Sequence, residues 1–159
     1  MKILHCVAAL CLLLGGLSIQ AEESTSVDLA IEEAVLAEAT RNWEAARAAD
    51  LSAMLEPLLS TDKGAYVAQS EVWWSREDTV AFYDAAFEGV ARQDIEWERE
   101  TVTVLSPTSA LYVGKGMYRQ YDSANEMLVE SPHAVSMVFV LIDGRWRMRH
   151  LHQSFPGGE

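Results

Sequence analysis

Three histidines and one serine near the C-terminus are the residues of this sequence whose types and spacing best suit chemistry. His150, His152 and Ser154 alternate within "DGRWRMRHLHQS", residues 143–154, and His133 lies earlier in the chain. Alternate residues of a β-strand project from the same face. Imidazole changes its charge near neutral pH, so histidines on one face offer acid–base catalysis or polar contacts to a ligand. The competing interpretation is a set of buried histidines that make only structural hydrogen bonds.

The dipeptide Asp143-Gly144 is a strong signal for a two-residue hairpin turn, and such a turn fixes the register of the strands that it joins. On this register the opposed residues are Ile142 and Arg145, Leu141 and Trp146, Phe139 and Met148, Met137 and His150, Val135 and His152, and His133 and Ser154. One face is then apolar near the turn and polar at the far end. We therefore predict that this face is the wall of a cavity, with a packed apex at the turn and the histidines nearer the mouth.

The same register argues against a metal site. It separates His133 from His150 by four positions, which is roughly 13 Å along the strands. Zinc binds nitrogen ligands at about 2.0–2.1 Å, so these two side chains cannot share one ion. His150 and His152 would need a third ligand, which the sequence does not identify. We expect no metal and no other cofactor.

The hydrophobic pattern predicts helices in the first half of the chain and strands in the second. Helical periodicity covers 27–49 and 51–59, and Ser75 is a candidate cap for a third helix. Alternation and turn signals predict strands at 64–69, 95–105, 110–121, 128–142 and 145–154. "SEVWWS", which carries Trp73 and Trp74, is expected to be a loop. This order predicts an α+β domain, with three N-terminal helices packed on one face of a curved antiparallel sheet.

The first 21 residues are typical of a secretory signal peptide. Lys2 precedes the uncharged apolar run "CVAALCLLLGGL", and Ala21 ends "SIQA", a suitable cleavage position. An uncleaved membrane anchor is the alternative, although the run is short for a span of roughly 20 residues. We expect one mature domain over 22–159 that is secreted or periplasmic. Both cysteines, Cys6 and Cys11, would leave with the signal.

The expected mature segment is strongly acidic. It carries 24 acidic residues against 11 basic ones, the 12 of the full chain less Lys2, so its net charge is −13. Such a charge repels nucleic acid and anionic membranes. We therefore expect neither nucleic acid nor, once the signal is cleaved, a membrane as a partner.

Several of these residues together resemble a known family. Trp43 and Asp50 in the helical part, "YV" at Tyr66 and "FY" at Phe82 precede the closing "DGRWRMRHLHQS". This pattern, over about residues 27–156, resembles the SnoaL-like, nuclear transport factor 2-like (NTF2-like) superfamily. The closing motif is most similar to the W-x-I-x-H-x-H-x-S strand of the calcium/calmodulin-dependent kinase association domain.

The resemblance implies a fold and a range of functions. The family fold is a cone-shaped α+β roll with a cystatin-like arrangement, in which a bent sheet wraps around a long helix and encloses a cavity. Members include polyketide cyclases, ketosteroid isomerases, dehydratases and pocket proteins without catalysis, so the fold does not choose among them. Where the isomerases carry a general-base Asp, this sequence has Gln69, whose amide is no useful base. Where some association domains carry an Arg, it has Gln153, with Lys115 and Arg119 as alternative cations.

Two functions remain open. The first, favoured by Gln69, is a secreted or periplasmic pocket protein that binds a small, largely apolar molecule. The second is a small-molecule enzyme of the cyclase, isomerase or dehydratase kind, with His150 or His152 as the acid or base and Asp50 assisting. Asp50 is also a natural cap for the helix over 51–59, which is the role we favour for it. The expected ligand contacts are Tyr66, Trp73, Tyr83, Tyr112, His133, His150, His152 and Ser154.

The opposite face of the closing hairpin predicts an association surface. Apolar and charged residues alternate there, namely Val138, Val140, Ile142, Arg145, Arg147, Arg149 and Leu151. Such a mixture is typical of a face that pairs with a second copy, and a solvated, charge-balanced face is the alternative. We expect a homodimer.

Overall fold

The structure is a computed structural model that describes residues 15–60, 63, 65–68 and 70–156. Along the chain its elements are α1 (Gly15–Arg47), α2 (Leu51–Leu55), β1 (Tyr66–Ala68), β2 (Glu71–Trp73), α3 (Arg76–Ala86), β3 (Arg92–Ser106), β4 (Ser109–Tyr121), β5 (Met127–Ile142) and β6 (Arg145–Ser154). The strands form one sheet in the order β2-β1-β6-β5-β4-β3. Neighbouring strands pair antiparallel except β1 and β6, which are parallel.

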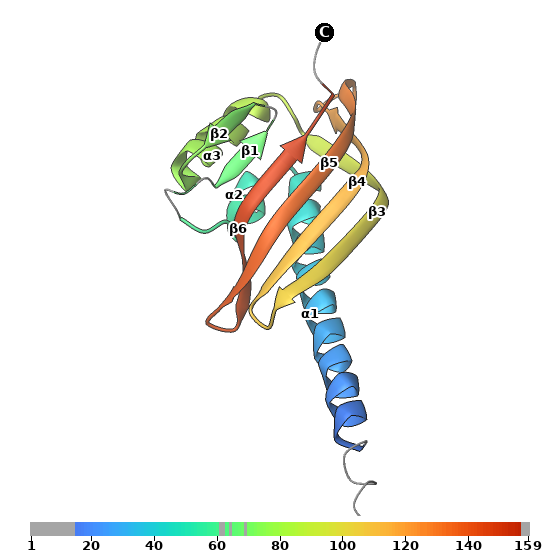
Figure 1. The fold of residues 1–159 in the computed structure, drawn as a ribbon. Coiled ribbons are helices and arrows are strands. Elements are labelled where there is room, and N and C mark those ends of the chain that lie inside the picture. The colour runs from blue at the N-terminus through green and yellow to red at the C-terminus, as the bar shows by residue number, and fades with distance from the viewer. Residues whose placement is uncertain (1–14, 61–62, 64, 69, 157–159) are drawn as a thin grey trace, which may run out of the picture.

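The sheet curves around the C-terminal half of α1, and the N-terminal part of α1 extends beyond the sheet (Figure 1). The shorter helices α2 and α3 lie at the end of the sheet formed by β1 and β2 (Figure 1). Helices on one face of a curved, mainly antiparallel sheet are the predicted α+β architecture, which is thereby confirmed.

Helix α1 packs on the sheet through small and aromatic residues at helical spacing. Val35, Ala39, Trp43 and Ala46 are all buried, as the periodicity predicted. Val27, earlier on the same predicted face, is 48% exposed because this part of α1 lies beyond the sheet (Figure 1). No helix within the described ranges is long and apolar enough to cross a membrane.

Two side-chain caps begin the shorter helices, and both were predicted. Asp50 Oδ1 accepts a hydrogen bond of 3.0 Å from the backbone N–H of Ala53 at the start of α2. Ser75 Oγ accepts one of 3.0 Å from the N–H of Asp78 at the start of α3. Such caps satisfy backbone donors that have no partner inside the helix and typically contribute about 1 kcal/mol each.

The segment "SEVWWS", predicted to be a loop, contains strand β2, so that prediction is wrong. Val72 opposes Val67 in an antiparallel pair of short strands. Trp73 stacks on Tyr66 with ring centroids 5.0 Å apart. Tertiary contacts of this kind favour a strand where local sequence indicates none.

Strand β6 contains an extra residue that the predicted register lacks. The pairing agrees with the prediction from the turn to Phe139 and Met148, and then Val138 opposes His150. Arg149 is therefore the extra residue of a β-bulge. An insertion of one residue moves every later side chain to the other face of the sheet.

The predicted register beyond Met148 is accordingly wrong. Leu151 opposes Met137 and Gln153 opposes Val135, and both Leu151 and Gln153 are buried. His152 and Ser154 are exposed. The bulge places apolar Leu151 in the core, where strict alternation would have placed a histidine.

Two glycines of β4 allow β3 to bend closely over it. A Cβ atom at Gly116 would lie 2.3 Å from the carbonyl oxygen of Glu96, and one at Gly114 would lie 2.8 Å from a ring carbon of Trp97. The β3–β4 register also shifts between Trp97 and Arg99. Glycine is the residue that tolerates such close backbone approach. The bend brings the Trp97 ring to within 5.7 Å of the His133 ring, measured between centroids.

Candidate functional site

A cavity of about 180 Å³ lies between α1, α3 and the concave face of the sheet. Its walls are mainly aromatic, and four polar side chains interrupt them. The lining residues are Trp43, Met54, Tyr66, Phe82, Tyr83, Ala86, Phe87, Gln93, Tyr118, Gln120, His133, Gln153 and Phe155. None of these described residues is acidic, and none is a lysine or arginine. The cavity is smaller than the roughly 300 Å³ at which pockets for drug-sized ligands begin, so it suits a small molecule.

The side chain of Gln153 is the centre of the polar network in this cavity. Tyr66 Oη donates a hydrogen bond of 2.6 Å to Gln153 Oε1, and Tyr83 Oη donates one of 2.9 Å to the same oxygen. The amide nitrogen of Gln153 lies 3.2 Å from His133 Nε2. Because the oxygen of this amide accepts both tyrosines, its nitrogen donates to His133.

This network assigns the tautomer of His133. A ring nitrogen that accepts a hydrogen bond carries no proton, so the proton of the neutral imidazole lies on Nδ1. Among the described residues, His133 Nδ1 has no hydrogen-bond partner, although it is buried. The side chain is only 3% exposed. His133 therefore holds an unused N–H donor in the wall of the cavity.

Aromatic rings surround His133. Phe155 stacks on it with centroids 5.3 Å apart and an angle of 16° between the rings. Tyr118 and Trp43 meet it nearer to edge-on, at 5.8 and 6.3 Å. Burial in these surroundings lowers the pKa of His133 from its ordinary value of 6.5 to about 4. The imidazole is consequently neutral at pH 7.

Burial also keeps the two tyrosines protonated. It raises the pKa of Tyr66 and of Tyr83 above the ordinary value of 10.0. Both phenols therefore remain hydrogen-bond donors to Gln153 at any physiological pH. The whole network of His133, Gln153, Tyr66 and Tyr83 is uncharged.

A second polar group in the cavity is a pair of glutamines. Gln93 on β3 opposes Gln120 on β4, and both are 9% exposed. Gln120 Nε2 donates a hydrogen bond of 3.0 Å to Gln93 Oε1. This pair is also uncharged, so the cavity offers hydrogen bonds and aromatic surface without a fixed charge.

Three of the predicted ligand contacts line the cavity: Tyr66, Tyr83 and His133. Two others do not line it, of which Tyr112 is buried and Trp73 is half-buried. Trp73 packs between Tyr66 and Phe82. Tyr112 Oη donates a hydrogen bond of 2.7 Å to Glu100 Oε1 and accepts one of 3.2 Å from Trp43 Nε1.

The remaining predicted contacts do not reach the cavity, and the bulge at Arg149 is the reason. His150 and His152 oppose Val138 and Ser136 on the outer face of the sheet, and Ser154 is exposed. The prediction that His150 and His152 lie in the wall of the cavity is therefore wrong for both residues. Of the three histidines on the predicted face, His133 is the one that lines the cavity.

The other residues considered from the sequence also lie elsewhere. Asp50 is an exposed cap of α2 and does not line the cavity. Lys115 pairs with Glu98, and Arg119 pairs with two glutamates on the neighbouring strands. Gln69, at the expected base position, lies outside the described residues. Within the described ranges, no three His, Cys, Asp or Glu side chains gather in a way that would hold a metal ion.

Sequence reasoning missed Gln153 as a cavity residue, together with Gln93 and Gln120. One signal for Gln153 was available: Leu151 is apolar but falls on the charged face if β6 alternates strictly. Moving Leu151 inward requires the bulge and also moves Gln153 inward. No comparable signal identifies Gln93 and Gln120, because glutamine occurs commonly on exposed strand faces.

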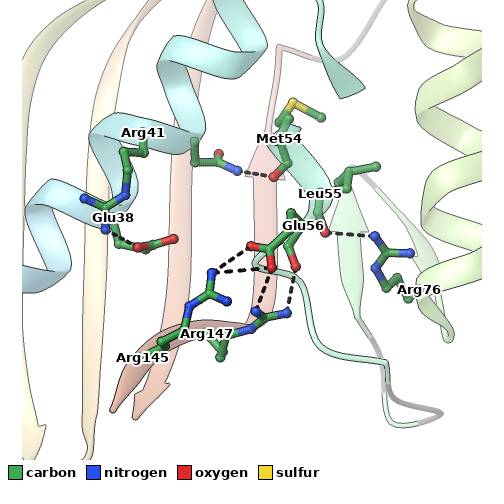
Figure 2. Close-up of polar contacts among 9 residues, drawn as sticks. Glu38, Arg41, Met54, Leu55, Glu56, Arg76, Arg145 and Arg147 are labelled. Carbon is green, nitrogen blue, oxygen red and sulfur yellow. Dashed lines mark hydrogen bonds and ion pairs between the residues drawn. The ribbon is translucent and has the colours of Figure 1, made fainter. Parts of the chain in front are cut away.

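A larger hollow of about 620 Å³ lies on the outside, between α1, α2 and the β5–β6 turn. Arg145 and Arg147 converge there on Glu56, the residue that follows α2 (Figure 2). Arg147 Nη1 donates a hydrogen bond of 2.9 Å to Glu56 Oε1, and its Nη2 donates one of 2.8 Å to the Glu56 carbonyl oxygen. On the side of α2 that faces α3, Arg76 donates a hydrogen bond of 3.3 Å to the carbonyl oxygen of Leu55 (Figure 2). The two arginines of β6 thus attach the end of α2 to the sheet, and both already contact the Glu56 carboxylate, so we do not regard the hollow as the candidate site.

The comparison with protein families agrees with the resemblance seen in the sequence. The sequence model of the SnoaL-like domain family matches residues 35–157. No match is found among curated proteins.

Many solved structures share the fold. A proposed scytalone dehydratase from Novosphingobium aromaticivorans is 9% identical with a TM-score of 0.70, and the match covers 84% of this chain and 89% of that one. An NTF2-like superfamily protein from Salmonella enterica serovar Typhimurium is 14% identical with a TM-score of 0.65, and the match covers 85% of this chain and 94% of that one. A proposed calcium/calmodulin-dependent protein kinase II association domain from Xanthomonas campestris is 20% identical with a TM-score of 0.62, and the match covers 77% of this chain and 87% of that one. At these identities the similarity shows the fold alone.

The lowered pKa of His133 predicts a specific loss of stability in acid. Between pH 6.5 and about 4, the unfolded chain binds a proton at this residue that the folded protein does not bind, so stability falls as the pH falls. From pH 7 to pH 4.5 the wild type should lose about 2 to 3 kcal/mol more free energy of unfolding than His133→Phe. Urea denaturation at both pH values measures this difference.

A control and a contradicting result are available for this prediction. His152→Phe changes an exposed residue and should alter the free energy of unfolding at pH 7 by less than about 0.5 kcal/mol. Parallel pH profiles for the wild type and His133→Phe would show that His133 is not a buried neutral imidazole.

Proposed function

Because the chain belongs to the SnoaL-like family, we propose that it binds a small, largely apolar, uncharged molecule in the cavity between α1, α3 and the sheet. The aromatic walls supply apolar contact area, which is the main source of affinity in such pockets. No described lining residue offers a full charge to pair with an ionic ligand, and burying an unpaired charge is costly. A neutral ligand is therefore the one that this cavity favours.

The observation that carries the proposal is the unused donor on His133. A buried N–H group without a partner costs about 1–3 kcal/mol, so few are retained in folded proteins. His133 lines the cavity, and a ligand with an acceptor atom would satisfy Nδ1 after a small adjustment of the surrounding rings. The hydrogen bond from Gln153 and the stacked Phe155 ring hold the imidazole in one orientation.

The alternative is an enzyme of the cyclase, isomerase or dehydratase kind. It is supported by the similarity of the fold to a proposed scytalone dehydratase. The histidine available for acid–base chemistry in the cavity would be His133, with a pKa of about 4. A base with so low a pKa is weak at neutral pH, and no described carboxylate lines the cavity to assist it. Binding without turnover is therefore the function that we favour.

Filling the cavity should abolish binding. Ala86 lines the cavity at the end of α3, and its neighbour Ala85 does not. An indole introduced by Ala86→Trp would occupy much of the 180 Å³, whereas Ala85→Trp would point away from it. Native mass spectrometry of protein purified from its source should show a retained small molecule on the wild type and on Ala85→Trp, and none on Ala86→Trp. The same added mass on all three proteins, or none on any of them, would contradict the proposal.

We also propose that residues 1–21 are a secretory signal and that the mature chain is secreted or periplasmic. The support is the apolar run followed by "SIQA". The first buried residue of α1 in the described core is Val35, so cleavage after Ala21 would leave that core complete. N-terminal sequencing of exported protein should begin at or within a few residues of Glu22. Exported protein that begins at Met1 would disprove cleavage.

We further propose a homodimer formed through the outer face of the sheet. The bulge changes the composition of this face: Leu151 is buried, and His150 and His152 lie on the outer side. Apolar side chains remain there, with Val113 43% and Ile142 42% exposed. Such a mixture of apolar and polar groups suits an interface between identical copies.

The dimer proposal predicts the effect of one charge on the outer face. Light scattering at micromolar concentration should give a dimer mass for the wild type and a monomer mass for Val113→Glu. Leu29→Glu is the matched control, because Leu29 is 55% exposed on α1 and is not on the outer face of the sheet. A monomeric wild type, or a Val113→Glu protein that remains dimeric, would rule out this interface.

A further inference from the structure

Two glutamine side chains lie next to each other in the wall of the cavity, on neighbouring strands. Gln93 of β3 directly opposes Gln120 of β4, and each is 9% exposed. Both line the same cavity as His133. Buried glutamines are uncommon, and their hydrogen bonds are normally satisfied.

Among the described residues, the pair leaves one amide nitrogen and one amide oxygen without any hydrogen-bond partner. A primary amide has two N–H donors and an oxygen that accepts two hydrogen bonds. One bond, from Gln120 Nε2 to Gln93 Oε1, joins the two side chains. Within the described part of the chain, Gln93 Nε2 and Gln120 Oε1 have no other partner. If both amides are turned over, the donor and acceptor exchange residues, but the pair still presents one of each.

These two atoms are also accessible. Among the side-chain nitrogen and oxygen atoms of the described residues, His133 Nδ1 is the one that is both inaccessible to solvent and without a hydrogen-bond partner. Gln93 Nε2 and Gln120 Oε1 also lack partners, but they do not share this complete loss of solvent-accessible surface. Since both residues line the cavity, a bound molecule can reach them.

We propose that Gln93 and Gln120 form a subsite for an amide edge, and that the ligand is a single-ring molecule carrying a primary carboxamide or lactam. The carbonyl of such a group accepts from Gln93 Nε2 while its N–H donates to Gln120 Oε1. This inference rests on the proposed function, because it assigns the ligand class of the same cavity. A cavity of about 180 Å³ limits the rest of the ligand to roughly one ring.

The same geometry disfavours a carboxylate. A carboxylate has acceptor oxygens only, so one of them would face Gln120 Oε1 without a hydrogen between them. No described lysine or arginine in the lining would offset its charge. The amide pair thus selects a neutral group with a donor and an acceptor side by side.

Three planar probes of nearly the same shape separate the contributions. Benzamide has a donor and an acceptor, acetophenone has an acceptor only, and α-methylstyrene has neither. Titration of each probe followed by protein NMR should show that the wild type binds benzamide at least as tightly as α-methylstyrene, although benzamide is far better solvated by water. Acetophenone should bind more weakly than benzamide, by about two- to tenfold for the missing hydrogen bond.

Gln93→Met and Gln120→Met each remove one half of the pair while keeping an unbranched side chain of similar length. Each should weaken benzamide about tenfold relative to α-methylstyrene. Thr103→Met is the matched control, because Thr103 is an exposed residue of β3 and does not line the cavity. It should leave both affinities unchanged. Thermal unfolding shows which variants are folded. If only one of the two glutamine variants folds, that variant alone is enough to test the subsite.

The results distinguish the two proposals. Binding of α-methylstyrene but not benzamide, or an unchanged ratio in the glutamine variants, would overturn the amide subsite and leave a general apolar pocket. Failure of all three probes to bind the wild type would overturn the subsite and count against the pocket function as well.

Discussion

The arrangement of the cavity depends on one extra residue, Arg149, in the strand that closes the sheet. Without this bulge, strict alternation would place His150 and His152 inside and Leu151 and Gln153 outside. With it, Leu151 completes the core and Gln153 enters the cavity, where it meets Tyr66, Tyr83 and His133. The same segment also pairs in parallel with β1, which carries Tyr66 opposite Leu151. A local change in the backbone thus determines which polar groups face the ligand space.

The polar groups that reach the cavity act together as a neutral set. Gln153 uses its oxygen for two phenols and its nitrogen for an imidazole, and burial keeps the phenols protonated and the imidazole unprotonated. Neutral partners can be buried at lower cost than charged ones. Ion pairs lie instead on the outside, for example where Glu56, which follows α2, contacts Arg145 and Arg147 (Figure 2). The charge distribution therefore separates a fully neutral cavity from a strongly acidic surface.

Much of the fold follows from patterns in the sequence, and the cavity follows less completely. The apolar face of α1 from Val35, the caps at Asp50 and Ser75 and the long strands are each fixed by local signals, and they agree with the structure. Strand β2 depends on pairing with β1 and on the stacking of Trp73, which local sequence does not encode. The bulge at Arg149 changes the face of only a few residues, but these include the histidines on which the sequence-based site was built. His133 precedes this point on a regular strand, and for that reason it lies on the predicted face of the sheet.

The protonation state of His133 is the most direct test of this arrangement, because it depends on both the register of β6 and the orientation of Gln153. Long-range correlation NMR between ring protons and nitrogens, recorded at pH 7 and assigned with His133→Phe, distinguishes the two tautomers and the imidazolium. The expected result is a neutral His133 with its proton on Nδ1 and an unprotonated Nε2. A proton on Nε2, or on both nitrogens, would contradict the hydrogen bond from Gln153 to His133. It would thereby also contradict the inward position that the bulge gives to Gln153.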